Sequence, residues 1–405
     1  MSGSQFTEHS AQVPAFLEKL LDGAGVKWKP LGEVVEYSPT RIDAAELDAT
    51  TFVGVDNLLP DKGGRIDASY LPNTARLTAF EPGDILIGNI RPYLKKVWKA
   101  TKAGGCSGDV LAVRIQKDWQ RTIDYGFLYY ILSSDDFFSY NMQHAKGAKM
   151  PRGNKAAILK YEIPIPCPDN PEKSLAIQAE IVRILDRFTE LTDELTDELT
   201  ARKKQYNHYR DQLLSFEESE VEWKALGEVA TIGTGSHDTQ DAIEDGDYIF
   251  YARGREPLRL NEFDFDETAI ITAGDGAGVG KVFHFAQGKY ALHQRAYRIA
   301  PSEVMEPRFV YHCIASHFYA YIQKASVSSS VTSLRRPMFL NFPIPVPSLA
   351  EQARIVAILD KFDTLTHSIS EGLPREIELR QKQYEYYRDL LLSFPKPESQ
   401  SEVVD

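Results

Sequence analysis

The chain contains the same series of short sequences twice, in the same order. In the first copy these are VKWKPLGEV, FLYYILSS, IPIPCP, EIVRILDRF and QYNHYRDQLLSF, and in the second VEWKALGEV, FVYHCIAS, FPIPVP, RIVAILDKF and QYEYYRDLLLSF. The last pair is identical at nine of twelve positions. An internal repeat constrains the fold more than any single motif, because both copies must fold as the same kind of unit. We therefore predict a duplicated unit, in which a globular module is followed by a helical arm.

The point at which the repeat begins predicts how the copies are connected. The sequence FLEKLLDGAGVKW, residues 16–28, resembles YRDQLLSFEESEVEW, residues 209–223, which joins the first arm to the second module. The chain thus opens on what looks like the tail of an arm, residues 1–25. This order predicts a circular arrangement about a pseudo-twofold axis, with the start and the end of the chain close together.

Two segments, 170–219 and 348–396, have the spacing of long amphipathic helices. In the first, apolar residues recur every three or four positions and so form one stripe: Ile177, Ile181, Ile184, Phe188, Leu191, Leu195 and Leu199. A helix from Pro171 to Phe216 spans roughly 60 Å, which is too long to be buried by one small domain. The second segment has a similar stripe, so we predict that the arms pair as an antiparallel coiled coil. The sequence GLP at 372–374 should break or kink the second helix.

The first arm also contains a unit that can be counted, TELTDELTDELT at residues 189–200. Each four-residue copy adds about 6 Å of helix and turns the apolar stripe by about 40°. We interpret Leu191, Leu195 and Leu199 as the repeated residues of a spacer whose length changes in discrete steps. The acidic residues between them form either a solvated flank or a surface offered to another protein.

The segments 26–169 and 220–347 have the pattern of globular modules. They contain strand-like runs at 83–88, 110–115 and 269–273 and helix-like stretches at 124–143 and 307–325. The predicted fold class is therefore α+β, with two mixed, β-rich modules joined by two long helices that form the antiparallel coiled coil. Residues 397–405 are predicted to be a disordered tail.

The net charge of −12 is concentrated in the arms. Residues 171–222 contain 13 acids and 7 bases, and residues 348–405 contain 11 acids and 7 bases. The modules are close to neutral by comparison. A near-neutral module can still present a basic face, so the acidic total does not exclude binding to a nucleic acid.

Basic, glycine-rich loops in the modules are the candidate DNA-binding sites. Such loops allow close approach to phosphates and base edges, where Arg, Lys and Asn are common donors. The candidates in the first module are Arg91, Lys95, Lys96, Lys146, Lys149, Arg152, Asn154 and Lys155. Those in the second are Arg253, Arg255, His293, Gln294, Arg295, Ser329, Ser330, Arg335 and Arg336. The hydroxyl-rich loop that precedes Arg335 stands where the first module has its basic loop.

The motifs of common catalytic sites are missing from the sequence. It contains no GxxxxGK[ST] phosphate loop, no nucleophile elbow and no zinc-ligand spacing among its three cysteines. The run GDGAGVG at 274–280 has neither the spacing nor the following helix of a dinucleotide loop. We therefore predict no catalytic residue, no metal site and no cofactor in this chain. Without a signal peptide or a long apolar run, we expect it to stay in the cytoplasm.

Two modules separated by repeated arms resemble the specificity subunits of type I restriction-modification enzymes, and most closely the type IC subgroup. The resemblance covers nearly the whole chain. It is most specific in the arms, at NPEKSLAIQAEIVRILDRF, ARKKQYNHYRDQLLSF and GLPREIELRQKQYEYYRDLLLSF, and in the TELT/DELT unit.

This resemblance implies a function in double-stranded DNA recognition. Each module would read one half of a split, asymmetric target, and the arms would set the gap and dock two methylase subunits. S-adenosylmethionine would bind to those subunits, and ATP and Mg²⁺ would be used by restriction subunits that join the complex. Two other classes stay open: an enzyme whose modules retain catalytic chemistry, and an assembly scaffold whose modules bind protein.

Overall fold

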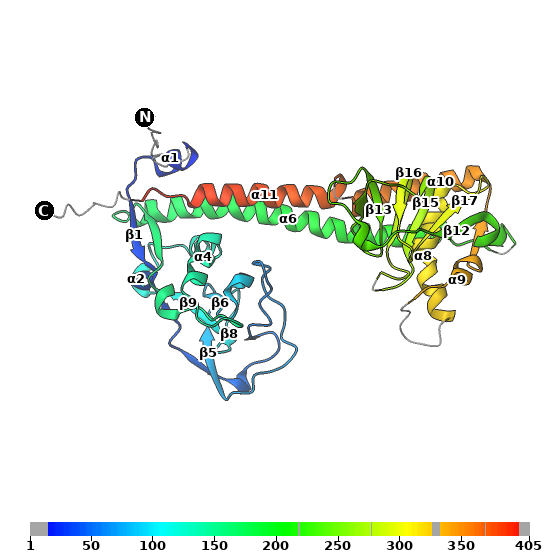
Figure 1. The fold of residues 1–405 in the computed structure, drawn as a ribbon. Coiled ribbons are helices and arrows are strands. Elements are labelled where there is room, and N and C mark those ends of the chain that lie inside the picture. Colours follow the sequence, from blue (N-terminus) through cyan, green and yellow to red (C-terminus); the bar gives the residue numbers. More distant parts are fainter. Residues whose placement is uncertain (1–14, 218, 277, 326–332, 369, 397–405) are drawn as a thin grey trace. The chain divides into compact units, whose positions relative to one another are not determined.

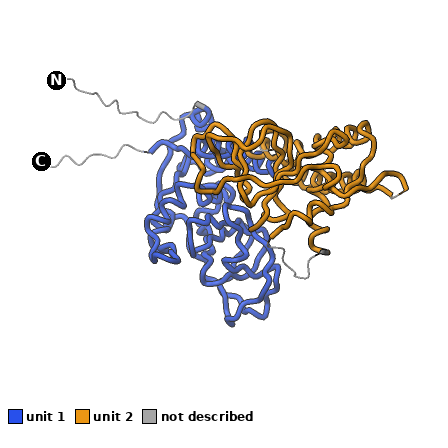
Figure 2. The backbone as a smooth tube through the Cα atoms, turned by 45° about the vertical axis from the view of Figure 1, so that its right-hand side comes forward, with its two compact units in different colours: residues 1–193, 379–405 blue, residues 194–378 orange. Residues whose placement is uncertain are grey.

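The computed structural model describes residues 15–217, 219–276, 278–325, 333–368 and 370–396. It divides into two compact units (Figure 2). Unit 1 comprises the chain up to Asp193 and again from Leu379, and unit 2 runs from Glu194 to Glu378. Each unit therefore contains one module together with parts of both arms. The divisions fall inside the helices α6 (Pro171–Leu213) and α11 (Gly372–Leu392).

Unit 1 contains two four-stranded sheets, in the orders β2-β9-β6-β7 and β3-β5-β8-β4, and the antiparallel pair β1-β10 (Figure 1). The strands are β1 (Val26–Pro30), β2 (Val35–Tyr37), β3 (Arg41–Asp43), β4 (Phe52–Val53), β5 (Arg76–Phe80), β6 (Ile85–Gly88), β7 (Val97–Lys99), β8 (Gly104–Cys106), β9 (Val110–Ile115) and β10 (Glu162–Pro166). The helices before α6 are α1 (Ala15–Leu21), α2 (Leu31–Val34), η1 (Ala44–Glu46), η2 (Pro92–Leu94), η3 (Lys117–Trp119), α3 (Tyr125–Leu132), α4 (Asp135–Gln143) and α5 (Lys155–Ile158).

Unit 2 has one six-stranded sheet, in the order β12-β17-β15-β16-β13-β14, and the antiparallel pair β11-β18. Its strands are β11 (Glu222–Ala225), β12 (Ala230–Thr234), β13 (Tyr248–Tyr251), β14 (Leu258–Leu260), β15 (Phe265–Ala273), β16 (Phe283–Leu292), β17 (Ala296–Pro301) and β18 (Pro343–Val346). Its helices are α7 (Leu226–Val229), η4 (Thr239–Asp241), α8 (Pro307–Ala325), α9 (Arg336–Leu340) and α10 (Leu349–His367), with the parts of α6 and α11 given above.

Most of the predicted elements of the modules are present. The three predicted strands appear as β6, β9 and the end of β15, and the predicted helix at 307–325 is α8. The prediction of one helix at 124–143 was wrong, because this segment forms two helices, α3 and α4. The break has a local cause: the Ser134 side chain accepts a hydrogen bond from the Phe137 N–H and so caps a new helix.

The core of each unit joins a helix of the module to an arm. In unit 1, Phe127 and Ile131 of α3 belong to the same buried cluster as Ile181 of α6. In unit 2, Phe309 and Ile314 of α8 cluster with helix α10 in the same way. Burial of these apolar side chains is the main force that holds each module on its arm.

A buried glutamine makes the same polar contacts between arm and module in both units. Gln178 accepts a hydrogen bond from the Asp124 N–H at 2.9 Å and donates to the Thr122 carbonyl at 2.7 Å. Gln352 likewise accepts from the Glu306 N–H at 2.7 Å and donates to the Val304 carbonyl at 3.2 Å. The repeat seen in the sequence therefore extends to individual hydrogen bonds.

The end of each arm packs on the module helix of its unit. Phe394, near the end of the described chain, makes an edge-to-face contact with Phe127 at 5.9 Å in unit 1. In unit 2 the counterpart Phe216 contacts Phe309 in the same manner at 6.4 Å. In unit 1 the Trp28 indole also donates a hydrogen bond to the carbonyl of residue 395 at 2.8 Å. The last described residues of the chain therefore contact its first strand.

The first arm is one continuous helix of 43 residues, α6, which passes through the TELT/DELT unit. Along that unit the three leucines are half-buried and most of the acids are exposed, as the predicted stripe requires. The second arm is broken as expected, into α10 and α11, and Gly372 adopts a left-handed φ of 75° where α11 begins. None of the helices in the described part of the chain could cross a membrane.

Aromatic contacts join the arms inside each unit. In unit 1, Phe188 of α6 stacks on Tyr387 of α11 with ring centroids 5.2 Å apart. In unit 2, Tyr209 of α6 stacks on Phe362 of α10 at 5.7 Å, while Tyr206, about one turn earlier, also contacts His367. A step forward along α6 is thus a step backward along α10, so these two helices are antiparallel.

Candidate nucleic-acid interface

Three segments of unit 1 meet where β6 ends. The Asn89 N–H donates to the Asp109 carbonyl at 2.8 Å, which joins the end of β6 to the turn before β9. The Gly153 N–H donates to the Asn89 carbonyl at 3.0 Å, and Ile90 forms a bridge with Arg152, so the basic loop 144–155 is joined as well. We call this meeting point the loop junction of unit 1.

Unit 2 has a loop junction with the same backbone connections. The Gly274 N–H donates to the Arg295 carbonyl at 2.8 Å, the Leu334 N–H donates to the Gly274 carbonyl at 2.7 Å, and Asp275 forms a bridge with Ser333. A side chain at Gly274 would place its Cβ 2.6 Å from the Arg295 carbonyl oxygen, so this close approach requires glycine. Segments that are far apart in the sequence are thus brought together in the same way in both units.

The predicted basic residues of the loop after β6 have different environments. Arg91 is exposed, and its backbone is left-handed at a φ of 51°. The Lys96 ammonium donates to the Val55 carbonyl at 2.7 Å. The Lys95 ammonium donates to the Asp135 carboxylate of α4 at 2.7 Å. Arg91 therefore remains the most accessible candidate here, and the two lysines also fix the loop to the module.

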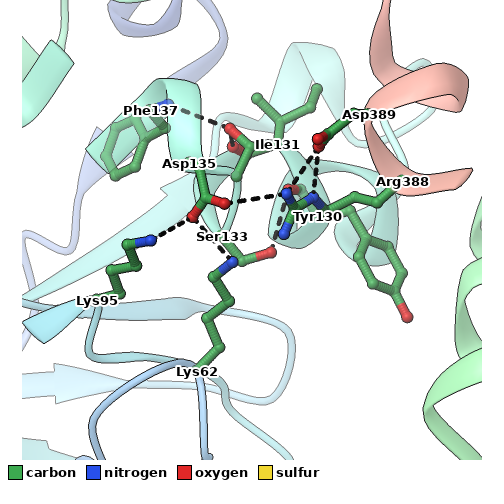
Figure 3. A network of polar contacts seen from close by, with 10 residues as sticks. Lys62, Lys95, Tyr130, Ile131, Ser133, Asp135, Phe137, Arg388 and Asp389 are labelled. Atoms are coloured by element: carbon green, nitrogen blue, oxygen red, sulfur yellow. Dashed lines mark hydrogen bonds and ion pairs between the residues drawn. The ribbon is translucent and has the colours of Figure 1, made fainter. Parts of the chain in front are cut away.

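Lys95 belongs to a network that centres on Asp135 (Figure 3). The same carboxylate pairs with Lys62 at 3.2 Å and with Arg388 of α11 at 3.1 Å. The Arg388 side chain is only 1% exposed, and it also pairs with Asp389. Burial alone would raise the pKa of Asp135, but the hydrogen bonds and charges of the three cations hold it well below its usual value. The network links the loop that carries Lys95 to the second arm.

The basic loop of unit 1 is a closed turn. Lys146 and Arg152 exchange backbone hydrogen bonds of 2.9 and 2.8 Å, and Gly147 between them has a φ of 98°. Lys146 and Lys149 are exposed on this turn, and so are Arg152 and Lys155 beyond it. The Asn154 side chain caps α5 by accepting from two backbone N–H groups. Asn154 therefore has a structural role that the sequence did not indicate.

In unit 2 the exposed candidates lie at three places around the junction. Arg253 and Arg255 are in the loop after β13, Gln294 and Arg295 are in the turn before β17, and Arg335 and Arg336 begin α9. Gln294 donates to the Asp238 carboxylate at 2.9 Å. Ser329 and Ser330 lie outside the described residues.

The structure contradicts the prediction that His293 is a DNA-binding residue. Its side chain is 1% exposed, so it cannot reach a DNA surface from this position. Its Nδ1 accepts a hydrogen bond from the Arg295 N–H at 2.9 Å, which orders the turn that carries Gln294 and Arg295. Burial and the nearby charge of Arg253 lower the pKa of His293, and this favours the neutral ring that the hydrogen bond requires.

Two acidic residues of the junctions, Asp109 and Asp275, were missed by the sequence analysis. Asp275 pairs with Arg253 and with Arg295, and Asp109 pairs with Arg152. The only sequence signal was an acid inside a loop of glycines or basic residues. Asp275 lies in the GDGAGVG run, where the spacing of the glycines does not indicate a role for the acid. Its partners are distant in the sequence, so spacing could not reveal them.

The described residues contain no group of three or more His, Cys, Asp or Glu side chains that could hold a metal ion. Burial raises the pKa of the Cys106 thiol to about 12 and also raises that of Cys313. A thiol with a raised pKa is a poor nucleophile. The basic loops are exposed and are joined to one another by backbone hydrogen bonds, an arrangement that suits recognition of a polyanion.

Comparison with known proteins agrees with this geometry. The family described as the type I restriction modification DNA specificity domain matches residues 103–202 and 218–379. The specificity subunit of the type I restriction enzyme EcoR124I/EcoR124II from Escherichia coli is 40% identical over 96% of this chain and 99% of its own length. The EcoprrI specificity subunit from the same organism is 34% identical over 88% of this chain and 92% of its own.

Solved structures show the same fold. The type I restriction-modification S subunit from M. genitalium matches 93% of this chain and 98% of its own, with a TM-score of 0.59 at 15% identity. A chain from a structure of type I R-M complex assembly and conformational transition matches 91% of this chain and 97% of its own, with a TM-score of 0.60 at 17% identity. The chain belongs to the specificity subunits of type I restriction-modification systems, which recognise the DNA target.

Proposed function

We propose that each unit reads one half of a split, asymmetric DNA target through its loop junction. The observation that carries this proposal is that both junctions have the same backbone connections and different side chains. Asp109 lies in the turn before β9 in unit 1, and Arg295 lies in the turn before β17 in unit 2. The facing loop presents Arg152 in unit 1 and Ser333 in unit 2. Two loop junctions that share their backbone connections but carry different hydrogen-bond donors and acceptors can recognise two different half-sites.

The arms hold the two reading units at a set distance as an antiparallel coiled coil. The aromatic stacking inside each unit and the continuous helix α6 support this role. The equivalent contacts of Phe394 and Phe216 support a circular, pseudo-twofold arrangement of modules and arms. The arm motifs support membership of the type IC subgroup.

As a specificity subunit the chain contributes recognition and not catalysis. We assign the chemistry to its partners in the cytoplasm. Two methylase subunits that use S-adenosylmethionine dock on the arms, and restriction subunits that use ATP and Mg²⁺ join them. The exposed acids of the TELT/DELT unit and the exposed aromatic Tyr386 offer a surface for such partners.

A module exchange tests this function. Residues 26–168 are replaced by the corresponding segment of a relative that has a different target, and the variant is combined with its methylase partners. Methylation mapping should show one new half-site, while the other half-site and the gap stay as they were. If both half-sites change, or if neither does, the two units do not read DNA independently.

The exposed lysines of the basic loop in unit 1 should contribute to binding through phosphate charge. Replacing Lys146 and Lys149 by glutamine should reduce the slope of log affinity against log salt concentration by about two, roughly one for each lost phosphate contact. The slope is measured by DNA binding of the assembled complex between low and physiological salt. A variant with glutamine at Lys27 and Lys117, which are exposed on β1 and η3, loses the same charge outside the junction. An equal change in that variant would contradict a local contact.

A further inference from the structure

Each loop junction contains one carboxylate that holds arginine side chains from other segments. In unit 2, Asp275 accepts a hydrogen bond from Nη1 of Arg253 at 3.0 Å and another from Nη1 of Arg295 at 3.2 Å. The two arginines come from the loop after β13 and from the turn before β17. Their side chains are 42% and 64% exposed, whereas that of Asp275 is 27% exposed. The carboxylate is thus the inner member of the group, and the guanidinium groups face outward.

The loop junction of unit 1 also contains a carboxylate paired with an arginine, but the two residues stand at other positions of the junction. Asp109 stands at the backbone position of Arg295, because its carbonyl accepts the Asn89 N–H just after β6, as the Arg295 carbonyl accepts the Gly274 N–H just after β15. Its carboxylate pairs with Nη1 of Arg152 at 2.8 Å, and Arg152 stands at the position of Ser333. The Arg152 side chain is 59% exposed. Both units therefore pair a less exposed carboxylate with a more exposed arginine, although these residues stand at different positions of the two junctions.

We propose that Asp275 and Asp109 are positioning residues, which hold Arg253 and Arg295 in unit 2 and Arg152 in unit 1 in the orientation that reads the DNA half-site. This proposal rests on the proposed function, since it names the residues that set the specificity of each unit. The arginines contact the DNA, and the carboxylates fix the orientation of the arginine side chains.

The chemistry of the arginine side chain supports this division. A guanidinium has five N–H donors, and each arginine of unit 2 gives Asp275 one hydrogen bond, so several donors remain for a base edge or a phosphate. A free arginine loses much rotamer freedom when it binds, and an arginine already held by a carboxylate loses less. A fixed, planar fork also selects guanine, whose O6 and N7 accept two parallel hydrogen bonds.

Asp275 keeps its charge under ordinary conditions. Burial alone would raise its pKa, but the hydrogen bonds and charges of Arg253 and Arg295 lower it below the usual value of an aspartate. The carboxylate is therefore ionised near neutral pH and can hold both guanidinium groups. An asparagine at this position keeps the shape and loses the charge that holds both arginines.

The alternative role is that of a shield, in which the carboxylate only reduces the positive charge of the junction. The two roles predict different results for Asp275→Asn. Loss of a shield strengthens binding to every DNA sequence and leaves the preference for one sequence unchanged. Loss of a positioning residue frees the arginines to contact phosphates and other bases, so that the preference itself is reduced.

The test uses the full complex with its methylase partners and DNA libraries in which one half-site at a time is randomised. Asp275→Asn should reduce the discrimination between correct and single-substituted sequences about tenfold in the half-site read by unit 2, the range expected for one good arginine–base contact. Asp109→Asn should do the same in the other half-site alone. The unchanged half-site in each variant shows that the protein is folded and assembled.

Asp266→Asn is the matched control, because it removes one exposed carboxylate from the other end of β15. Both half-sites should keep their discrimination in this variant. Unchanged discrimination in Asp275→Asn, a gain in affinity for all sequences alone, or an equal loss in both half-sites would overturn the proposal. A wild-type complex without any half-site preference would overturn the proposed function, so the two failures are distinguishable.

Discussion

Deletion of Asp193–Thr196, one copy of the four-residue unit in α6, should shorten the unspecified gap of the target by one to two base pairs and leave both half-sites unchanged. Four residues of α-helix are about 6 Å long, and stacked base pairs are about 3.4 Å apart. The deletion also rotates the two ends of the helix by about 40° relative to one another, close to the turn of one base pair. The loss of length and the added twist thus suit a small change in the gap.

Methylation mapping of a strain that carries the deletion measures this directly. Insertion of a further DELT after Thr200 should lengthen the gap by the same amount. An unchanged gap in both variants would show that the helix does not set the spacing, and altered half-sites would show that the deletion disturbs the modules.

A length-preserving variant separates distance from charge. Glu194→Gln together with Asp197→Asn removes two exposed acids of the unit and leaves the length of the helix unchanged. The gap should remain that of the wild type in this variant. A changed gap here would mean that the acids act through a partner surface, which is the other interpretation of the repeat.

The sequence predicted the arms well, because their structure follows from local periodicity. An apolar residue every three or four positions indicates a helix, and the run GLP at 372–374 favours a break next to it. Residues 171–213 form the predicted helix, and the predicted break appears between α10 and α11. The strands β6 and β9 and the end of β15 were likewise predicted from local sequence, as short strand-like runs.

The candidate interface was only partly predictable, because its contacts join residues that are distant in the sequence. A lysine in a basic loop looks accessible whether or not a carboxylate holds it, and Lys95 is held by Asp135. His293 looks like a donor beside Gln294 and Arg295, yet it is buried and orders their turn. The positions of Asp109 and Asp275 become meaningful only when the loop junctions are seen.

The buried glutamines that join each arm to its module should matter strongly for stability. Gln178→Leu removes the side chain that accepts from the Asp124 N–H and donates to the Thr122 carbonyl and to Ser174. The Asp124 N–H would lose this acceptor, and the Thr122 carbonyl would keep only the longer hydrogen bond from the Ser174 hydroxyl at 3.3 Å, so we expect the free energy of unfolding of unit 1 to fall by about 2–4 kcal/mol. Gln352→Leu should destabilise unit 2 by a similar amount for the same reason.

Hydrogen exchange can follow the two units separately within one molecule. Gln178→Leu should increase exchange in α3, and Gln352→Leu in α8, while the helix of the other unit stays protected. Gln212→Leu is the matched control, because this glutamine is exposed on α6 and its replacement should change the stability by less than about 0.5 kcal/mol. Loss of protection in both units, or an equal effect of the control, would contradict the assignment.

The same variants connect stability to target recognition. A coiled coil can fix the distance between two half-sites only if each module is fixed to its arm, and the buried glutamine supplies the directional part of that attachment. A variant complex with Gln178→Leu should therefore accept gaps one base pair longer and one base pair shorter more readily than the wild type, without a change in either half-site. Binding to a series of targets that differ only in gap length measures this. A gap preference as sharp as that of the wild type, in a variant whose α3 exchanges faster, would show that apolar packing alone orients the module.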